Sequence, residues 1–260
     1  MHPMLHTAVR SVREGARIIL MYYRQLDRLE ISSKGRNDFV SQADIEAERA
    51  IIEVLTRAYP DHGVLAEESG ARVAGEYTWV IDPLDGTTNF LHGFPMFCIS
   101  VAVMKGTAIE HGVVYDPLRD EMFTASRGEG AQLNGKRIRV SKTRQLAPAL
   151  LGTGFPFREL AHVKPWLRTF EQLLPKTTGI RRAGAAALDL AYVAAGRLDG
   201  FWEMGLKPWD LAAGALLIRE AGGLVADFAG GQDYIESGNV VAANPFLLED
   251  LRKIINRSSD

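Results

Sequence analysis

The stretch that decides the fold of this chain lies at residues 79–90 and has the sequence WVIDPLDGTTNF. Its first three residues are apolar and partly β-branched, which predicts a buried strand. The strand ends in a DPLDG segment, because proline and glycine both interrupt regular structure. Asp82 and Asp85 therefore lie at the end of a strand, and Thr87 and Thr88 behind them are suited to cap a short helix.

This one segment offers ligands of two kinds. Hard cations bind carboxylate oxygens, which Asp82 and Asp85 supply. Phosphate oxygens bind backbone N–H groups at helix N-termini, and Gly86 lets a ligand approach the backbone closely. An acidic junction between a strand and a turn explains the same residues without any ligand, so the rest of the chain has to decide.

Two further acidic residues lie in a similar setting. Glu67 follows the apolar segment 64–66, and Asp210 follows Trp209 at the start of an expected helix. Each has a structural explanation, Glu67 as a solvated turn residue and Asp210 as a helix N-cap. Taken with Asp82 and Asp85, they indicate that carboxylates converge at one edge of the sheets.

Converging carboxylates repel one another. At ~4 Å and an effective dielectric constant near 20, each pair costs ~4 kcal/mol, so the group requires divalent cations or protonation. Because the donors are all oxygen and include no histidine or cysteine, the pattern favours Mg²⁺, with Mn²⁺ as a substitute.

The remaining sequence predicts sheets layered with helices. A meander of strands joined by turn residues comes first, and helices and strands alternate afterwards. Asn134-Gly135 is a strong hairpin signal, and the segment 34–38 has the composition of a loop. Apolar periodicity predicts helices at 4–24, 44–58, 161–173, 185–195, 211–221 and 246–256, and strands at 97–104, 108–115, 121–125, 137–140, 200–203, 224–227 and 239–243. Ile45, Ile52 and Leu55 form the expected apolar face of the second helix.

Bulk composition narrows the class of protein. The 260 residues include 30 Lys and Arg against 32 Asp and Glu, which argues against nonspecific nucleic-acid binding as the main task. The single cysteine, Cys98, lies in an apolar run, so it is expected to pack in a core, and a reducing cytoplasm fits best. We expect no membrane association, since no signal peptide and no apolar run of ~20 residues is present.

Three segments together resemble the signature of the inositol monophosphatase family. They are Glu67-Glu68-Ser69, the DPLDGTTNF segment at 82–90, and Trp209 to Gly214 followed by Glu220 to Gly223. The segment 188–203 is similar to the bacterial SuhB-type branch. The resemblance covers nearly the whole chain and implies one domain over 1–260 with an alternating αβαβα fold, its lobes at about 1–147 and 148–260 and the site between them. It also implies Mg²⁺-dependent hydrolysis of phosphomonoesters, lithium inhibition and a homodimer.

The resemblance assigns metal ligands. Glu67, Asp82 and the backbone carbonyl of Leu84 would hold one Mg²⁺, and Asp82, Asp85 and Asp210 a second. Glu67 would also help to position a third, weaker ion, so that two to three ions bind per site.

The resemblance also assigns catalytic and substrate-binding residues. Thr87 and Asp44 would orient the nucleophilic water, with Glu67 beside them. The N–H groups of Gly86 and Thr87 would receive the phosphate. Three residues match positions that face the polyol, namely Asp85, Ala186 and Glu203.

Some matches to the family are incomplete or open. Lys34 and Asp38 match a mobile loop that closes on the metals. Ala185 stands where a Ser or Thr is usual, which leaves polyol selectivity open. His92 is expected to shape a turn, and Arg181 and Arg182 to lie at a solvated or dimer-facing edge.

The expected chemistry is in-line attack by a metal-activated water without a phosphoenzyme, because the chain has neither a Cys-x5-Arg phosphatase loop nor a convincing nucleophilic histidine. Inositol 1-phosphate is the first candidate substrate. Fructose 1,6-bisphosphate, 3′-phosphoadenosine 5′-phosphate, NADP and histidinol phosphate remain alternatives. A third possibility is a role in transcription antitermination and ribosomal RNA maturation through RNA polymerase or Nus factors, without a direct nucleic-acid-binding motif.

Overall fold

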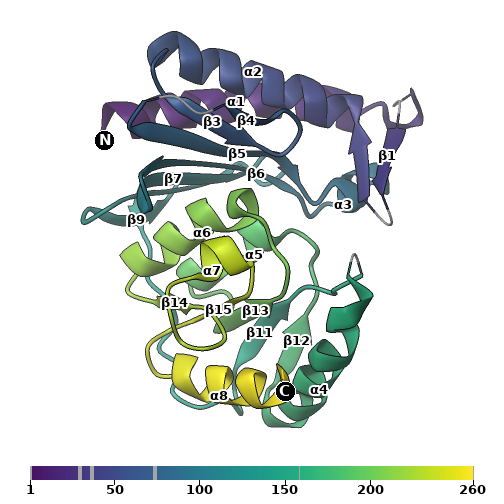
Figure 1. Ribbon diagram of the computed structural model, residues 1–260, viewed down its shortest axis with the longest axis vertical. Coiled ribbons are helices and arrows are strands. Elements are labelled where there is room, and N and C mark those ends of the chain that lie inside the picture. The colour runs from purple at the N-terminus through teal and green to yellow at the C-terminus, as the bar shows by residue number, and fades with distance from the viewer. Residues whose placement is uncertain (1, 29–30, 36–37, 73–74, 158, 260) are drawn as a thin grey trace.

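The protein is built of five alternating layers of helices and sheets (Figure 1). The computed structural model describes residues 2–28, 31–35, 38–72, 75–157 and 159–259, with side chains except at 28, 31–40 and 257–259. From one side to the other, the layers are α1 (Pro3–Tyr23) with α2 (Gln42–Ala58), an eight-stranded sheet, α5 (Ala186–Ala194) with α6 (Pro208–Glu220), a five-stranded sheet, and α4 (Val163–Leu173) with α8 (Leu248–Ser259). The expected αβαβα architecture is confirmed.

The larger sheet contains the stretch that opened the sequence analysis. Its strand order is β10-β9-β8-β7-β6-β5-β3-β4, with β5 (Tyr77–Asp85) parallel to β3 and antiparallel to β6. The other strands are β3 (Gly63–Ala66), β4 (Gly70–Arg72), β6 (Cys98–Lys105), β7 (Ala108–Asp116), β8 (Glu121–Ser126), β9 (Gly130–Leu133) and β10 (Lys136–Arg137). Leu133 pairs with Lys136 across Asn134-Gly135, which confirms the predicted hairpin.

The smaller sheet has the order β12-β11-β13-β15-β14. Its first three strands are parallel, and β15 runs antiparallel to both of its neighbours. The strands are β11 (Leu150–Thr153), β12 (Gly179–Arg181), β13 (Gly200–Glu203), β14 (Leu224–Ala226) and β15 (Val240–Ala243), and the short helix α7 (Tyr234–Ser237) precedes β15.

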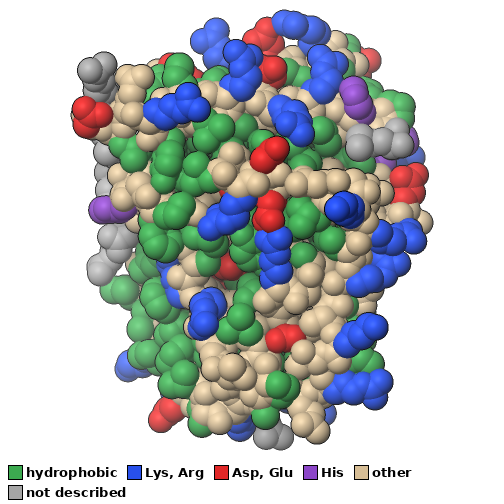
Figure 2. Space-filling view, turned by 180° about the vertical axis from the view of Figure 1, so that it is seen from behind, with side chains coloured by type: hydrophobic (Ala, Val, Ile, Leu, Met, Phe, Trp, Pro, Cys, Tyr) green, Lys and Arg blue, Asp and Glu red, His purple; other side chains and the backbone are tan. Residues whose placement is uncertain are grey.

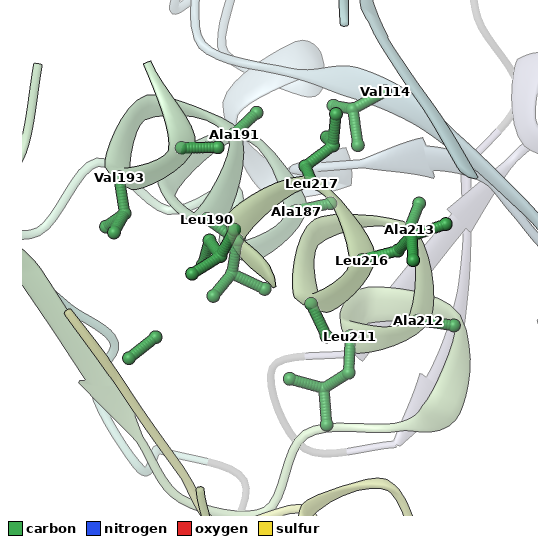
Figure 3. Close-up of a cluster of buried hydrophobic side chains, with 14 of the residues drawn as sticks. Val114, Ala187, Leu190, Ala191, Val193, Leu211, Ala212, Ala213, Leu216 and Leu217 are labelled. Carbon is green, nitrogen blue, oxygen red and sulfur yellow. The ribbon is translucent and has the colours of Figure 1, made fainter. Parts of the chain in front are cut away.

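The middle layer of α5 and α6 joins the two sheets through a buried core. Figure 3 shows Leu190 of α5 close to Leu211 and Leu217 of α6, with Val114 of β7 above them. Many of the core residues in these helices are alanines, which lets the helices lie close together. Gly214 shows how close, because a Cβ atom there would lie 2.5 Å from the Cβ atom of Leu190.

The structure differs from the sequence predictions in three local details. Ile31–Gly35 (β1) and Asp38–Ser41 (β2) form short antiparallel strands that include both ends of the segment 34–38, which we expected to be a loop, while residues 36–37 lie outside the described part. Residues 138–140 are not in a strand, whereas 130–133 are, because the strand after Asn134-Gly135 pairs with β9 over Lys136 and Arg137 alone. Ile45 is 48% exposed instead of buried, since α2 turns Asp44 and Glu48 inward on its buried face.

Seen from behind, the basic and acidic side chains on the surface are mixed instead of being sorted onto separate layers (Figure 2). Lys and Arg side chains are spread over this face among acidic ones, while hydrophobic side chains gather along one side of it (Figure 2). Within the described residues, no helix is both long and apolar enough to cross a membrane.

Candidate active site

A pocket of about 610 Å³ gathers residues from both halves of the chain. The resemblance singled out ten site residues, and nine of them line this pocket: Glu67, Asp82, Leu84, Asp85, Gly86, Thr87, Ala186, Glu203 and Asp210. The tenth, Asp44, reaches it through a hydrogen bond with Thr87. The strand end at 82–85 and the N-terminal ends of α5 and α6 therefore meet at one hollow.

Three carboxylates form the acidic centre of this pocket. One oxygen from each of Asp82, Asp85 and Asp210 lies within 4.8 Å of the others. Each carboxylate is held by a backbone N–H group: Leu84 donates to Asp82 at 2.9 Å, Ala187 to Asp85 at 2.7 Å and Lys207 to Asp210 at 2.7 Å. The carboxylates are thus fixed in place before any ligand binds.

Asp210 shows that the structural and the functional interpretation of a residue can both hold. We considered it as the N-cap of its helix, but α6 begins earlier, at Pro208. Asp210 is the third residue of α6, and its carboxylate accepts the N–H of the cap residue, Lys207. One oxygen therefore caps the helix while the side chain still faces the pocket.

Crowding of negative charge raises the pKa values in this cluster. Burial raises the pKa of Asp82 well above its ordinary value, and the charges of Glu67, Asp85 and Asp210 add to the shift. Burial, followed by the charge of Asp210, raises the pKa of Asp85 to about 7. Glu67 lines the same pocket and acts on Asp82 electrostatically, although it lies outside the group of three.

The donor set fits a hard divalent cation. All the donors are carboxylate oxygens, and a bound cation would relieve the repulsion that burial and proximity create. Side chains positioned by backbone N–H groups can bind such an ion without first being ordered.

Gly86 turns the chain from β5 into α3 (Thr87–Leu91). Its φ angle is +95°, in the left-handed region, and an added Cβ atom would lie 2.8 Å from the carbonyl oxygen of Met96. Gly86 itself is the N-cap of α3, so the expectation that Thr87 and Thr88 cap this helix is wrong. Because Thr87 is the first residue of the helix, its hydroxyl is available to other partners.

The Thr87 hydroxyl lies 3.0 Å from Asp44 Oδ1 and 3.1 Å from the carbonyl oxygen of Leu84. Asp44 is 1% exposed, and its other oxygen accepts the backbone N–H of Ser41 at 2.8 Å and the Ser41 hydroxyl at 2.5 Å. Burial raises the pKa of Asp44, whereas the hydrogen bonds from Ser41 and Thr87 oppose that shift. The pair predicted from the resemblance is thus in contact.

Other residues that position the site were missed in the sequence. Glu48 accepts the N–H groups of Glu68 and Ser69, each at 2.8 Å, and so fixes the turn that carries Glu67. This role of Glu48 could have been predicted from the sequence, because Glu48 lies four positions after Asp44 on the same face of the helix.

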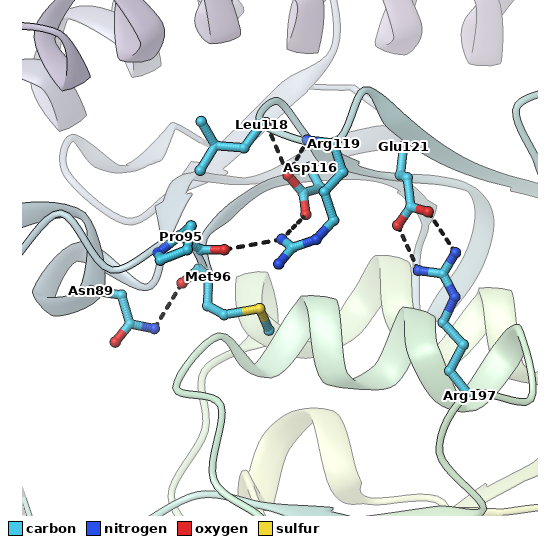
Figure 4. A network of polar contacts seen from close by, with 8 residues as sticks. All are labelled: Asn89, Pro95, Met96, Asp116, Leu118, Arg119, Glu121 and Arg197. Carbon is cyan, nitrogen blue, oxygen red and sulfur yellow. Dashed lines mark hydrogen bonds and ion pairs between the residues drawn. The ribbon is translucent and has the colours of Figure 1, made fainter.

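Asn89 ties the larger sheet to the middle layer. It donates to the carbonyl oxygens of Met96 at 2.7 Å and Ala183 at 2.9 Å. Figure 4 shows the same loop held on its other side, where Arg119 donates to the Pro95 carbonyl oxygen and to Asp116. These contacts fix the loop after α3 against the segment that leads into α5.

The wall opposite the acidic cluster is also charged. Burial raises the pKa of Glu203 well above its ordinary value, and the charges of Asp210 and Asp189 add to it. Arg182, which we expected at a solvated or dimer-facing edge, instead lines the pocket, with its guanidinium 5.0 Å from the ring centre of Phe155.

The remaining expected residues have varied outcomes. His92 lines the pocket, and Ala185 is buried beside Gly86. Cys98 is fully buried, as expected of a packing residue. The side chains of Lys34 and Asp38 lie outside the described part of the protein.

The chain is similar to known proteins in both sequence and structure. The sequence model of the inositol monophosphatase family matches residues 1–259. A Pseudomonas aeruginosa protein named Nus factor SuhB is 51% identical over 94% of this chain and 92% of its own length. The crystal structure of the extragenic suppressor protein SuhB from Bartonella henselae has a TM-score of 0.96 at 42% identity, covering 98% of this chain and 99% of that one. An inositol monophosphatase from Anabaena has a TM-score of 0.87 at 37% identity, covering 97% and 95%.

The layered fold and the carboxylate-lined pocket define a protein of the metal-dependent phosphatase class. More particularly, the chain belongs to the inositol monophosphatase family, and its similarity extends to proteins named SuhB.

Proposed function

We propose that this protein is a Mg²⁺-dependent phosphomonoester hydrolase that converts inositol 1-phosphate to inositol and phosphate. The observation that carries the proposal is the convergence of Asp82, Asp85 and Asp210 within 4.8 Å, in a pocket also lined by Thr87, whose hydroxyl donates to the buried Asp44. Similarity to the Anabaena inositol monophosphatase supports the choice of substrate.

Each group of residues has a distinct task in this proposal. Asp82, Asp85, Asp210, Glu67 and the Leu84 carbonyl hold two to three cations. When bound, the cations neutralise the phosphoryl oxygens and lower the pKa of the attacking water. The backbone N–H groups of Gly86 and Thr87 lie where α3 begins and receive the phosphate.

Thr87 and Asp44 orient the water. When the Thr87 hydroxyl donates its proton to Asp44, its lone pairs are left to accept a hydrogen bond from the water. Asp44 has to be ionised for this, because it already accepts two hydrogen bonds from Ser41. Asp85, Ala186 and Glu203 contact the polyol on the side away from the attacking water.

A panel of phosphomonoesters tests the proposal. It contains inositol 1-phosphate, fructose 1,6-bisphosphate, 3′-phosphoadenosine 5′-phosphate, NADP and histidinol phosphate, each assayed with Mg²⁺, with Mn²⁺, with Mg²⁺ plus Li⁺, and with a chelator. We expect inositol 1-phosphate to have the highest kcat/KM, Mn²⁺ to substitute for Mg²⁺, Li⁺ to inhibit and the chelator to abolish turnover. Negligible hydrolysis of inositol phosphates beside turnover of another ester would reassign the substrate.

A second function is favoured by the relatives named Nus factor SuhB, at 51% identity over 94% of this chain. We propose that the protein also acts with the transcription antitermination machinery, as a homodimer in the cytoplasm. Asp82→Asn and Asp210→Asn separate the two functions in a cell that lacks the wild-type protein. Growth and ribosomal RNA maturation that survive while hydrolysis is lost would assign the cellular role to the protein–protein contact.

A further inference from the structure

Asp189 is a buried carboxylate that the proposed reaction does not use. It lies in α5, where the adjacent residues Leu188 and Leu190 are fully buried, and it is itself 2% exposed. Despite that burial, Asp189 lines the active-site pocket. It faces Gly152 of β11, where a Cβ atom would lie 3.7 Å from its carboxyl carbon.

Within the described part of the chain, the Asp189 carboxylate accepts no hydrogen bond and forms no ion pair. Burial raises the pKa of Asp189 well above its ordinary value, and the charge of Asp85 adds to the shift, whereas Arg182 opposes it only through space. The Arg182 guanidinium is instead stacked on the rings of Phe155 and Phe157, at 5.0 and 5.2 Å from their centres. Since a buried carboxylate is normally satisfied, this one has capacity to bind a hydrogen-bond donor from outside the chain.

The position of Asp189 indicates which donor that is. Asp85 accepts the N–H of Ala187, so the acidic cluster lies at the first turn of α5 and Asp189 follows it on the same helix. The proposed function places the leaving group against Glu203, which lines the same pocket as Asp189. Asp189 lies outside the group of three carboxylates, which favours a hydroxyl over a further cation.

We propose that Asp189 is a specificity-determining residue whose carboxylate accepts a hydrogen bond from a hydroxyl group of the leaving group. The assignment rests on the proposed function and deepens it. The pocket then selects polyhydroxylated leaving groups over aryl or alkyl ones, because a site built to bind a hydroxyl is left with an unpaired buried group when that hydroxyl is missing.

The test is a selectivity measurement on the Mg²⁺-loaded full chain. The ratio of kcat/KM for inositol 1-phosphate to kcat/KM for p-nitrophenyl phosphate is determined for the wild type, Asp189→Asn and Asp189→Ala. In Asp189→Ala, loss of one hydrogen bond to a charged group predicts that the ratio falls by about 10- to 100-fold, whereas the amide oxygen of Asp189→Asn can still accept a hydrogen bond and should cause a smaller fall. Monodeoxy analogues of inositol 1-phosphate locate the hydroxyl: the wild type discriminates against one of them, and Asp189→Ala does not.

Asp199→Asn is the control, because Asp199 is a half-buried carboxylate outside the pocket that accepts the N–H of Leu150 at the start of β11. We expect this control variant to keep the wild-type kcat/KM ratio and the wild-type discrimination among the monodeoxy analogues, even if its own stability falls. A wild type that hydrolyses all monodeoxy analogues equally overturns the proposal without any variant, and so does a folded Asp189→Ala enzyme with the wild-type ratio. If the wild type hydrolyses p-nitrophenyl phosphate but no inositol phosphate, inositol 1-phosphate is not the substrate. The ratio of kcat/KM for glycerol 2-phosphate to that for p-nitrophenyl phosphate then still tests the role of Asp189.

Discussion

The Thr87 hydroxyl and the Asp44 carboxylate lie 3.0 Å apart, although 43 positions separate the two residues in the sequence. Asp44 is in the first turn of α2 in the outer layer, and Thr87 is the first residue of α3. The contact brings an outer helix to the end of strand β5, next to the acidic cluster. It also joins the carboxyl group of Asp44, whose pKa burial raises, to the hydroxyl group of Thr87, a residue that lines the pocket.

We expect Thr87→Val to lower kcat about 100-fold, because it removes the hydroxyl that orients the water while conserving the shape of the side chain. Steady-state kinetics at saturating Mg²⁺ measures this. Thr87→Ser restores the hydroxyl and is expected to recover most of the activity. Equal activity of the valine and serine variants would exclude the hydroxyl from the reaction.

We expect Asp82→Asn to stabilise the metal-free protein and to abolish its stabilisation by Mg²⁺. Removing one of the converging charges relieves repulsion of about 1–4 kcal/mol, whereas a bound ion at about 100 times its Kd would stabilise the wild type by ~2.7 kcal/mol. Thermal unfolding with chelator and with Mg²⁺ measures both effects. Asp61→Asn, at an exposed position, is the control, and a Mg²⁺-dependent rise in Tm that persists in Asp82→Asn would contradict the ligand assignment.

Stability of the metal-free protein is expected to fall as pH rises through the range in which Asp85 titrates. The pKa of Asp85 is raised from 3.8 to about 7, so the folded state binds more protons than the unfolded state between these values. The stabilising contribution is complete below the unfolded-state pKa and is lost as pH rises through the folded-state pKa, by up to about 4 kcal/mol.

Urea unfolding with chelator, in the wild type and in Asp85→Asn, measures this linkage. Taking the difference between the two proteins removes the contribution of titrating groups remote from Asp85 and leaves that of Asp85 together with the carboxylates that interact with it. We expect the wild type to lose stability relative to Asp85→Asn between about pH 4 and pH 7. A difference that does not vary with pH would mean that Asp85 is ionised throughout.

Gly86→Ala is expected to be more damaging than Gly70→Ala. Both glycines have positive φ angles, +95° and +76°, so both substitutions incur the left-handed backbone cost of about 1 kcal/mol. Only at Gly86 would the new Cβ atom meet backbone, 2.8 Å from the Met96 carbonyl oxygen. Chemical unfolding and kcat should both reveal the difference, and equal effects would show that the turn tolerates a side chain.

Sequence alone determined the layered architecture and the ligand chemistry of the site. Apolar periodicity predicts helices and strands directly. β5 continues through Pro83 and ends at Asp85, because Gly86 then takes a left-handed conformation that glycine adopts readily. Carboxylate side chains likewise carry their preference for hard cations with them.

Only the tertiary structure decided which distant groups meet. Asp189 and Glu48 lie in helices whose periodicity predicts the helix but not what its polar side chains face, and Arg182 lies in the segment between β12 and α5. Asp189 lines the pocket because α5 packs between the two sheets, and Arg182 does so because aromatic rings hold its guanidinium there. Such contacts depend on the packing of whole layers, which no local pattern in the sequence encodes.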